Sequence, residues 1–203
     1  MKEMFDSFSL KDFSVLLLFF LHWVVITVLA FRCRKYQLLS GKDGLTGVLN
    51  HRAIESVANT KISRVKRYEN YSLFFLFIDV DDFKQVNEKR GHRIGDGLLR
   101  DITEIMVKNT RNSDIIGRWG GDEFLLILSE IYLSGAKAVA EKIINAVNDL
   151  SRENDLGIGV TIGICEFNAS SAEKDPIGAS NETMREAKKS GKNQFFVYGS
   201  DNS

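Results

Sequence analysis

Cysteine, histidine and net charge are all scarce in this sequence of 203 residues. The two cysteines, Cys33 and Cys165, lie far apart, which argues against a disulfide framework, and no CxxC-type metal motif is present. The three histidines, His22, His51 and His92, are scattered, which argues against a zinc site. The 27 basic and 27 acidic side chains cancel, so there is no electrostatic case for general nucleic-acid binding. Internal repeats and low-complexity tracts are also absent.

Long hydrophobic runs are rare too, with one exception near the amino terminus. Residues 13–31, FSVLLLFFLHWVVITVLAF, carry no formal charge and would form a helix of about 28 Å, enough to cross a bilayer core. A cleaved signal peptide and a buried helix are the alternatives. The run is long for a signal peptide, and Arg32, Arg34 and Lys35 follow it directly. We therefore predict one transmembrane helix, with the excess of Lys and Arg after it placing the rest of the chain in the cytoplasm.

The remainder alternates between apolar runs and amphipathic helical patterns. Residues 71–78 form a nearly continuous apolar run, as a strand buried on both faces does. Helical spacing of apolar residues predicts helices over 94–107, 136–147 and 182–190, the last ended by Gly191. Further strands are predicted over 115–119, 124–128, 156–165 and 194–198. This mixture predicts an α+β fold with a mostly antiparallel sheet flanked by helices.

Two glycines and two acids stand together in Trp119-Gly120-Gly121-Asp122-Glu123-Phe124. Because Gly-Gly separates two predicted strands, the pattern predicts a hairpin with a tight primed turn, in which glycine supplies positive φ. Such a turn would hold Asp122 and Glu123 at the tip of a rigid hairpin. The alternative is an ordinary solvated turn, since Gly and Asp are common in turns.

A second group of acids follows the buried apolar strand. Asp79 stands at its end, followed by Val80, Asp81 and Asp82. If this strand neighbours the hairpin, Asp79 and Asp122 converge, and two carboxylates together with substrate phosphates suit Mg²⁺. Paired metal ions could then clamp the attacking and leaving oxygens of a phosphoryl transfer. The alternative is a polar exit from a strand into a loop.

Several short motifs follow one another through this part of the chain. They are DGLTGVLN at residues 43–50, DVDDFK at 79–84, Asn87 followed by Gly91-His92 and Gly95-Asp96, GGDEF at 120–124, and Ala187-Lys188 followed by Gly191-Lys192-Asn193. In this order and at these spacings they closely resemble the GGDEF family of diguanylate cyclases, over residues 43–198. The resemblance implies a fold like that of nucleotidyl cyclases and polymerase palm domains.

The resemblance also implies an activity. Each domain would bind one GTP, and a homodimer would condense two GTP into cyclic di-GMP with release of two pyrophosphates. Asp79, Asp122 and the backbone carbonyl of Val80 would bind Mg²⁺, two ions per active site, with Mn²⁺ as a possible replacement. Asp122 or Glu123 would assist deprotonation of the attacking 3′-hydroxyl.

Substrate-binding residues are implied in the same way. Asn87 and Asp96 would recognise guanine, and an Asp can accept from its N1–H and N2–H₂ edge. His92 would lie beside the substrate, although a packing role in its loop is equally reasonable. Lys84, Lys188 and Lys192 would neutralise phosphates. Lys192 stands where the family usually has Arg, so it keeps the charge but loses bidentate geometry.

An R-x-x-D tetrapeptide, Arg111 to Asp114, is separated from Gly120 by five residues. At this spacing it resembles the family's product-inhibition site, where Arg111 would contact guanine or phosphate of cyclic di-GMP and Asp114 a guanine edge. The alternative is a surface salt bridge or a turn between a helix and a strand.

Other functions stay open at this point. A catalytically weak GGDEF module could act as a receptor for GTP or cyclic di-GMP, although such relatives usually lose the acids that Asp122 and Glu123 retain. A cyclase with a mixed product is disfavoured by Asp96, and a plain scaffold leaves Asp79 and Asp122 unexplained.

The predicted organisation has five parts. Residues 1–12 are a short extracytoplasmic end, 13–31 the membrane helix, 32–42 a linker, 43–198 the GGDEF domain and 199–203 a tail. The expected location is the bacterial inner membrane, crossed once, with the catalytic domain in the cytoplasm.

Overall fold

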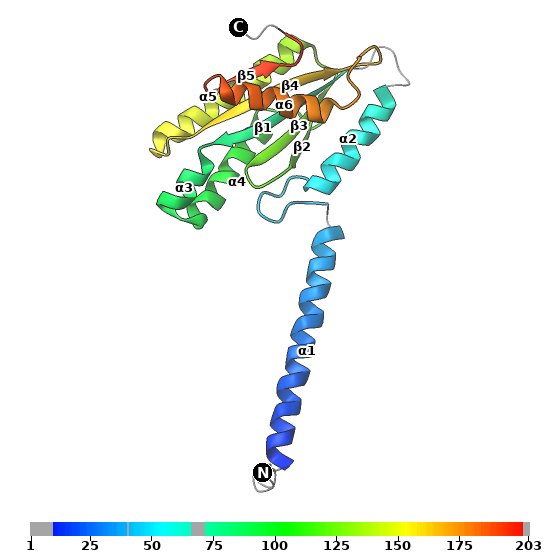
Figure 1. Cartoon of the computed structure of the whole chain (residues 1–203), viewed down its shortest axis with the longest axis vertical. Helices are drawn as coiled ribbons and strands as arrows, with labels where there is room; N and C mark the ends of the chain where they lie inside the picture. The colour runs from blue at the N-terminus through cyan, green and yellow to red at the C-terminus, as the bar shows by residue number, and fades with distance from the viewer. Residues whose placement is uncertain (1–9, 40, 66–71, 201–203) are drawn as a thin grey trace. The chain divides into compact units, whose positions relative to one another are not determined.

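The computed structural model describes residues 10–39, 41–65 and 72–200 (Figure 1). The chain divides into two compact units, Met1–Gly41 and Lys42–Ser203. Each is described by itself below.

The first unit contains a single described helix, α1, over Leu10–Leu39. The predicted helix is therefore present, and it continues through most of the predicted linker. Its side chains between Val15 and Leu29 expose large apolar groups, such as Phe19 at 69% and Trp23 at 64%. In the described part of the chain, however, no helix meets the requirements of length and apolar character for crossing a bilayer. The predicted membrane span is therefore not supported by the structure.

The second unit is built on a five-stranded sheet in the order β2-β3-β1-β4-β5. Its strands are β1 (Leu73–Asp81), β2 (Ile115–Arg118), β3 (Glu123–Ser129), β4 (Gly159–Phe167) and β5 (Phe195–Val197). Only β4 and β5 pair in parallel, and the other three pairings are antiparallel. The predicted α+β fold with a mostly antiparallel sheet is confirmed.

Helices cover both faces of this sheet. One apolar cluster joins it to α4 (His92–Lys108) and α5 (Leu133–Glu153), and the other joins it to α2 (His51–Val65) and α6 (Pro176–Lys189). Figure 1 shows α6, in orange, crossing one face of the sheet. A short helix, α3 (Phe83–Arg90), leaves the end of β1. The predictions missed α2 and α3.

The central strand β1 faces both layers. Phe74, Leu76 and Ile78 belong to the cluster with α4 and α5, whereas Phe75 and Phe77 belong to the cluster with α2 and α6. Because side chains alternate along a strand, Asp79 and Asp81 at its end fall on the α2 and α6 side. The strand therefore ends by directing two carboxylates toward one helical layer.

Helix α6 packs directly on β4 at a glycine. A Cβ atom added to Gly163 would lie 2.0 Å from the carbonyl oxygen of Ser180 and 2.3 Å from the amide nitrogen of Met184. No other residue type fits there without moving the helix. This contact fixes the height of α6 over the sheet and brings its last turn, with Lys188, toward the end of β1.

Candidate active site

The end of β1 and the turn before β3 lie side by side. Asp79 pairs with Glu123 across the two antiparallel strands, and the amide of Val80 donates to the carbonyl oxygen of Asp122 over 3.1 Å. The strands are therefore neighbours, as the predicted convergence of Asp79 and Asp122 requires. Asp79 thus lies at the same end of the two strands as Asp122 and Glu123, which follow it by more than 40 residues in the chain.

The turn itself differs from the prediction. The amides of Trp119 and Gly120 both donate to the carbonyl oxygen of Glu123, over 2.8 and 3.2 Å, so three residues rather than two lie within the turn. Neither Gly120 nor Gly121 is among the glycines with positive φ, so the predicted tight primed turn is wrong. The side chain of Glu123 folds back over Gly120, where an added Cβ would lie 2.6 Å from its Oε2.

Arg118 ties this turn to the start of the domain. Its Nη2 donates to the carbonyl oxygen of Gly121 over 2.6 Å, and its Nη1 donates to Oδ1 of Asp43 over 3.1 Å. The same Asp43 oxygen accepts from the amide and hydroxyl of Thr46, over 2.9 and 2.7 Å. Burial acts to raise the pKa of Asp43, but the hydrogen bonds from Thr46 and Arg118 outweigh it and hold that pKa below its usual value. This link was not predictable from the sequence, since Arg118 and Asp43 are 75 residues apart.

Lys188 balances the acids at the end of β1. Its ammonium forms a hydrogen-bonded ion pair with Asp79 and lies 3.7 Å from Oδ1 of Asp81. Burial raises the pKa of Asp79 to about 6; Lys188 opposes the rise, and the nearby carboxylates of Asp122 and Glu123 add to it. The site thus concentrates negative charge in a partly buried place, where a cation is stabilising.

These residues fit a magnesium ion that shares its coordination with a substrate. Carboxylate and carbonyl oxygens are the hard ligands that Mg²⁺ takes, usually few from the protein and the rest from phosphates and water. In the part of the chain described by the structure, no group of three or more His, Cys, Asp or Glu side chains forms a cage for a metal. The two carboxylates of Asp79 and Asp122 with the carbonyl of Val80 match the shared arrangement.

The predicted guanine-binding residues lie on α3 and α4. The side chain of Asn87 covers Gly95, where an added Cβ would lie 2.0 Å from its Oδ1, so Asn87 is next to the segment that carries Asp96. Asp96 and His92 are both exposed on α4. The structure therefore brings Asn87 close to the Gly95-Asp96 pair.

The predicted phosphate-binding lysines differ in their surroundings. Lys84 is 88% exposed and pairs with Glu88 at 3.6 Å, one turn further along α3. Lys192 instead donates to Oδ1 of Asp82 over 2.9 Å and lies beside the exit of β1. That hydrogen bond is the main cause of a lowered pKa at Asp82. The structure thus joins Lys188 and Lys192 to the acidic run after residue 78, but not Lys84.

Arg111 and Asp114 form a separate feature before β2. The carboxylate of Asp114 accepts from the amide of Arg111 over 2.8 Å, and both residues line a cavity of about 400 Å³ with Gly47 and Thr110 among its other walls. The predicted product-inhibition residues therefore lie at the start of β2, and the acidic turn follows its end.

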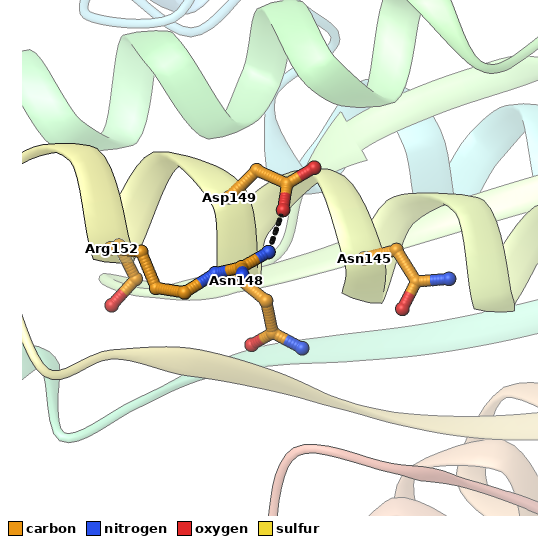
Figure 2. A pocket seen from close by; sticks show the side chains of 5 residues that line it. Asn145, Asn148, Asp149 and Arg152 are labelled. Carbon is orange, nitrogen blue, oxygen red and sulfur yellow. Dashed lines mark hydrogen bonds and ion pairs between the residues drawn. The ribbon is translucent and has the colours of Figure 1, made fainter.

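A further cavity, of about 440 Å³, lies on α5 (Figure 2). Its labelled residues are Asn145, Asn148, Asp149 and Arg152, and Asp149 forms an ion pair with Arg152 one turn away. None of the predicted site residues lines it, so it does not contribute to the acidic site.

Residues 40–194 match the family described as diguanylate cyclase, GGDEF domain. The chain belongs to the GGDEF family. A curated relative, the probable diguanylate cyclase DgcC of Escherichia coli (strain K12), is 30% identical over 174 residues, which cover 84% of this chain and 47% of DgcC. This GGDEF chain thus spans about half the length of that relative.

Solved structures agree with the fold. The GGDEF domain of DgcB from Caulobacter crescentus, solved in complex with c-di-GMP, has a TM-score of 0.72 at 22% identity and covers 79% of this chain and 97% of its own. The diguanylate cyclase SiaD from Pseudomonas aeruginosa, solved with its activator SiaC, has a TM-score of 0.70 at 27% identity. That match covers 92% of this chain and 77% of SiaD.

Proposed function

We propose that this GGDEF protein is a diguanylate cyclase, which condenses two GTP molecules into cyclic di-GMP and releases two pyrophosphates. The observation that carries the proposal is the convergence of Asp79 with the turn that holds Asp122 and Glu123. A receptor that only binds nucleotide has no need of this cluster of carboxylates, whereas phosphoryl transfer through metal ions does. The receptor alternative is therefore the less favoured of the two.

Each part of the site would have one task. Asp79, Asp122 and the carbonyl of Val80 would hold two Mg²⁺, or Mn²⁺ in their place. When bound, the ions would supply positive charge against the triphosphate and the charge that develops during transfer. The partly buried acids would hold the metal ions at the end of β1, next to the turn before β3. Glu123 or Asp122 would accept the proton of the attacking 3′-hydroxyl.

The substrate would extend from the acids toward α3 and α4. Lys188 and Lys192, already beside the acidic run, would bind phosphates, and Lys84 would approach them from the exposed face of α3. Asn87 and Asp96 would hydrogen-bond the guanine edge, with His92 beside it. The two ends of the site would therefore bind the substrate differently. The lysines would bind the phosphates through their charge, and Asn87 and Asp96 would bind guanine through directional hydrogen bonds.

The reaction needs two copies of the chain. One domain has one set of acids and would bind one GTP. Each 3′-hydroxyl must reach the α-phosphate of another GTP. We therefore propose a homodimer that brings two sites face to face. Sedimentation of the full chain with GTP and Mg²⁺ tests this, and a species that stays monomeric while it turns over would exclude it.

We further propose that the first unit attaches the protein to the bacterial inner membrane, with the GGDEF domain in the cytoplasm. The support is the uncharged run over 13–31 and the exposed apolar side chains of α1 between Val15 and Leu29. Fractionation of cells that express the full chain tests it. Recovery in the supernatant without detergent would rule the proposal out.

The central experiment is turnover of GTP by the full chain. With GTP and Mg²⁺ we expect pyrophosphate and cyclic di-GMP, and Asp122→Asn should lower the rate by about 10²-fold or more, since one metal ligand and its charge are lost. Asp149→Asn on α5 is the matched control and should keep the wild-type rate, because Asp149 forms its ion pair with Arg152 of the same helix. A folded, GTP-binding wild type that makes no product would refute the proposed function in favour of a receptor.

A further inference from the structure

A buried polar cluster lies at the end of β1, two residues after Asp79. Asp81 is 2% exposed, and among the residues that the structure describes it is the only buried side chain that carries a charge. The hydroxyl of Thr161 lies 2.9 and 2.8 Å from its two carboxylate oxygens, and the amide of Asn193 donates to Oδ2 over 2.9 Å. We call Asp81, Thr161 and Asn193 the Asp81 cluster.

The carboxylate of Asp81 is not accessible to a ligand. Both of its oxygens face donors from β4 and from the loop after α6, and little of its surface meets solvent. Asp79, on the same face of the strand, is less buried and lies beside Glu123 and the turn at Asp122. A charged group held inside the protein is stable only when it is well bonded, and Thr161 and Asn193 supply these bonds to Asp81.

What the cluster holds is a left-handed turn after α6. Gly191, Lys192 and Asn193 have φ of 137°, 59° and 46° in succession. Residues with side chains keep this conformation only where their surroundings fix it. The amide of Asn193 is fixed by Asp81, and its side chain fills the space beside Gly159, where a Cβ would lie 2.6 Å from Asn193 Oδ1.

This turn carries one of the proposed phosphate-binding lysines and adjoins the other. Lys192 is its central residue, and its ammonium reaches Oδ1 of Asp82 over 2.9 Å. Lys188 lies four residues earlier, at the end of α6, and its ammonium is 3.7 Å from Oδ1 of Asp81. The backbone next to Lys192 is therefore bonded to the Asp81 cluster at Asn193, and the ammonium of Lys188 lies beside Asp81 while it pairs with Asp79.

We propose that Asp81, fixed by Thr161, is a positioning residue that sets where Lys192 and Lys188 meet the substrate triphosphate. The inference rests on the proposed function, since it takes the triphosphate as the ligand of these lysines. It assigns the second Asp of the DVDDFK run to the alignment of phosphate-binding groups, apart from the metal-binding acids.

The test removes the hydroxyl of Thr161 from the chain. Thr161→Val keeps the shape and suits a strand, whereas Thr161→Ser retains the donor. The probe is 3′-deoxy-GTP with Mg²⁺, which lacks the attacking hydroxyl. Because a hydrogen bond to a charged group is lost, Thr161→Val should bind it roughly tenfold more weakly. Thr161→Ser should stay within about twofold of wild type, since its hydroxyl can make the same bond.

A double-variant cycle separates positioning from general damage. If Thr161 acts through the turn, Lys192→Met and Thr161→Val together should weaken binding by less than the product of their separate effects. Additive losses would overturn the inference. So would wild-type affinity in a folded Thr161→Val, or an equal loss in Thr161→Ser.

Hydrogen exchange gives a readout that does not depend on the reaction. The backbone amides of 190–194 should exchange faster in Thr161→Val and at the wild-type rate in Thr161→Ser, with or without nucleotide. Unchanged exchange in Thr161→Val overturns the inference even if the enzyme is active. If the wild type binds 3′-deoxy-GTP but forms no cyclic di-GMP when it is given GTP and Mg²⁺, the proposed function alone is refuted.

Discussion

At the scale of single residues, the site depends on charges whose partners are distant in sequence. Asp43 is an example: it stands at the start of the domain, yet its carboxylate accepts from Arg118, which in turn donates to Gly121 in the acidic turn. One carboxylate therefore supports both the first motif and the turn. This makes Asp43 suitable for a test of stability against pH.

We predict that Asp43→Asn lowers the free energy of unfolding at pH 7 by about 1–2 kcal/mol, because charged hydrogen bonds to Thr46 and Arg118 are weakened. The pKa of Asp43 is lowered in the folded state from an ordinary value of 3.8, so its contribution is complete above that value and is lost as the pH falls through the folded pKa. Urea unfolding across this range measures it.

The control for this prediction is Asp101→Asn, at an exposed position on α4. It should change the free energy of unfolding by at most about 0.5 kcal/mol at any pH. If the deficit of Asp43→Asn stayed constant as the pH fell below the folded pKa, its charge would not be the cause.

At the scale of helices and strands, the contact of α6 with β4 places Lys188. We predict that Gly163→Ala destabilises the protein by about 1–3 kcal/mol, because the new methyl group meets the backbone of Ser180 and Met184. The displaced helix should also lower the affinity for GTP. Denaturant unfolding and nucleotide titration measure the two effects.

Gly97→Ala in α4 is the matched control. A Cβ at Gly97 meets nothing within 4 Å, and its φ is not positive. Since Ala is the better helix former, this variant should be as stable as wild type or up to about 1 kcal/mol more stable. Equal behaviour of the two alanine variants would show that α6 does not rest on Gly163.

The elements that the sequence predicted are those with strong patterns. The apolar run over 71–78 became β1, and the spaced apolar residues of 94–107 became most of α4, since both bury long apolar stretches. Helices α2 and α3 were missed because they bury little: Ile54, Ala58 and Val65 in α2 and Val86 in α3. Few apolar positions leave a weak periodicity.

The candidate site also contains residues that could be predicted from the sequence and residues that could not. Asp79 and Asp122 could be placed because one ends a buried strand and the other follows two glycines. The role of Asp81 could not, since its partners Thr161 and Asn193 are 80 and 112 residues away and the run DVDD does not distinguish its own members. The shape of the turn at Gly120 was also beyond the sequence, because the hydrogen bonds to Glu123 decide it.

At the scale of the whole molecule, β2 separates two regions with different proposed tasks. The acidic turn follows its end, and the cavity lined by Arg111 and Asp114 lies at its start. A ligand in that cavity would contact Ile116 in β2 and Gly47 near the start of the domain. None of the acids Asp79, Asp122 and Glu123 lines the cavity, so cyclic di-GMP bound there would leave them free for substrate.

We predict that Arg111→Ala keeps the initial rate of GTP turnover and raises the concentration of cyclic di-GMP needed for half-inhibition by about tenfold or more, since a charge-assisted contact is removed. Initial rates with increasing product measure it. Lys108→Ala, three residues earlier, removes an equal charge that pairs with Glu104 and should leave inhibition unchanged. Loss of inhibition in both variants would point to net charge, and loss in neither would place feedback outside this cavity.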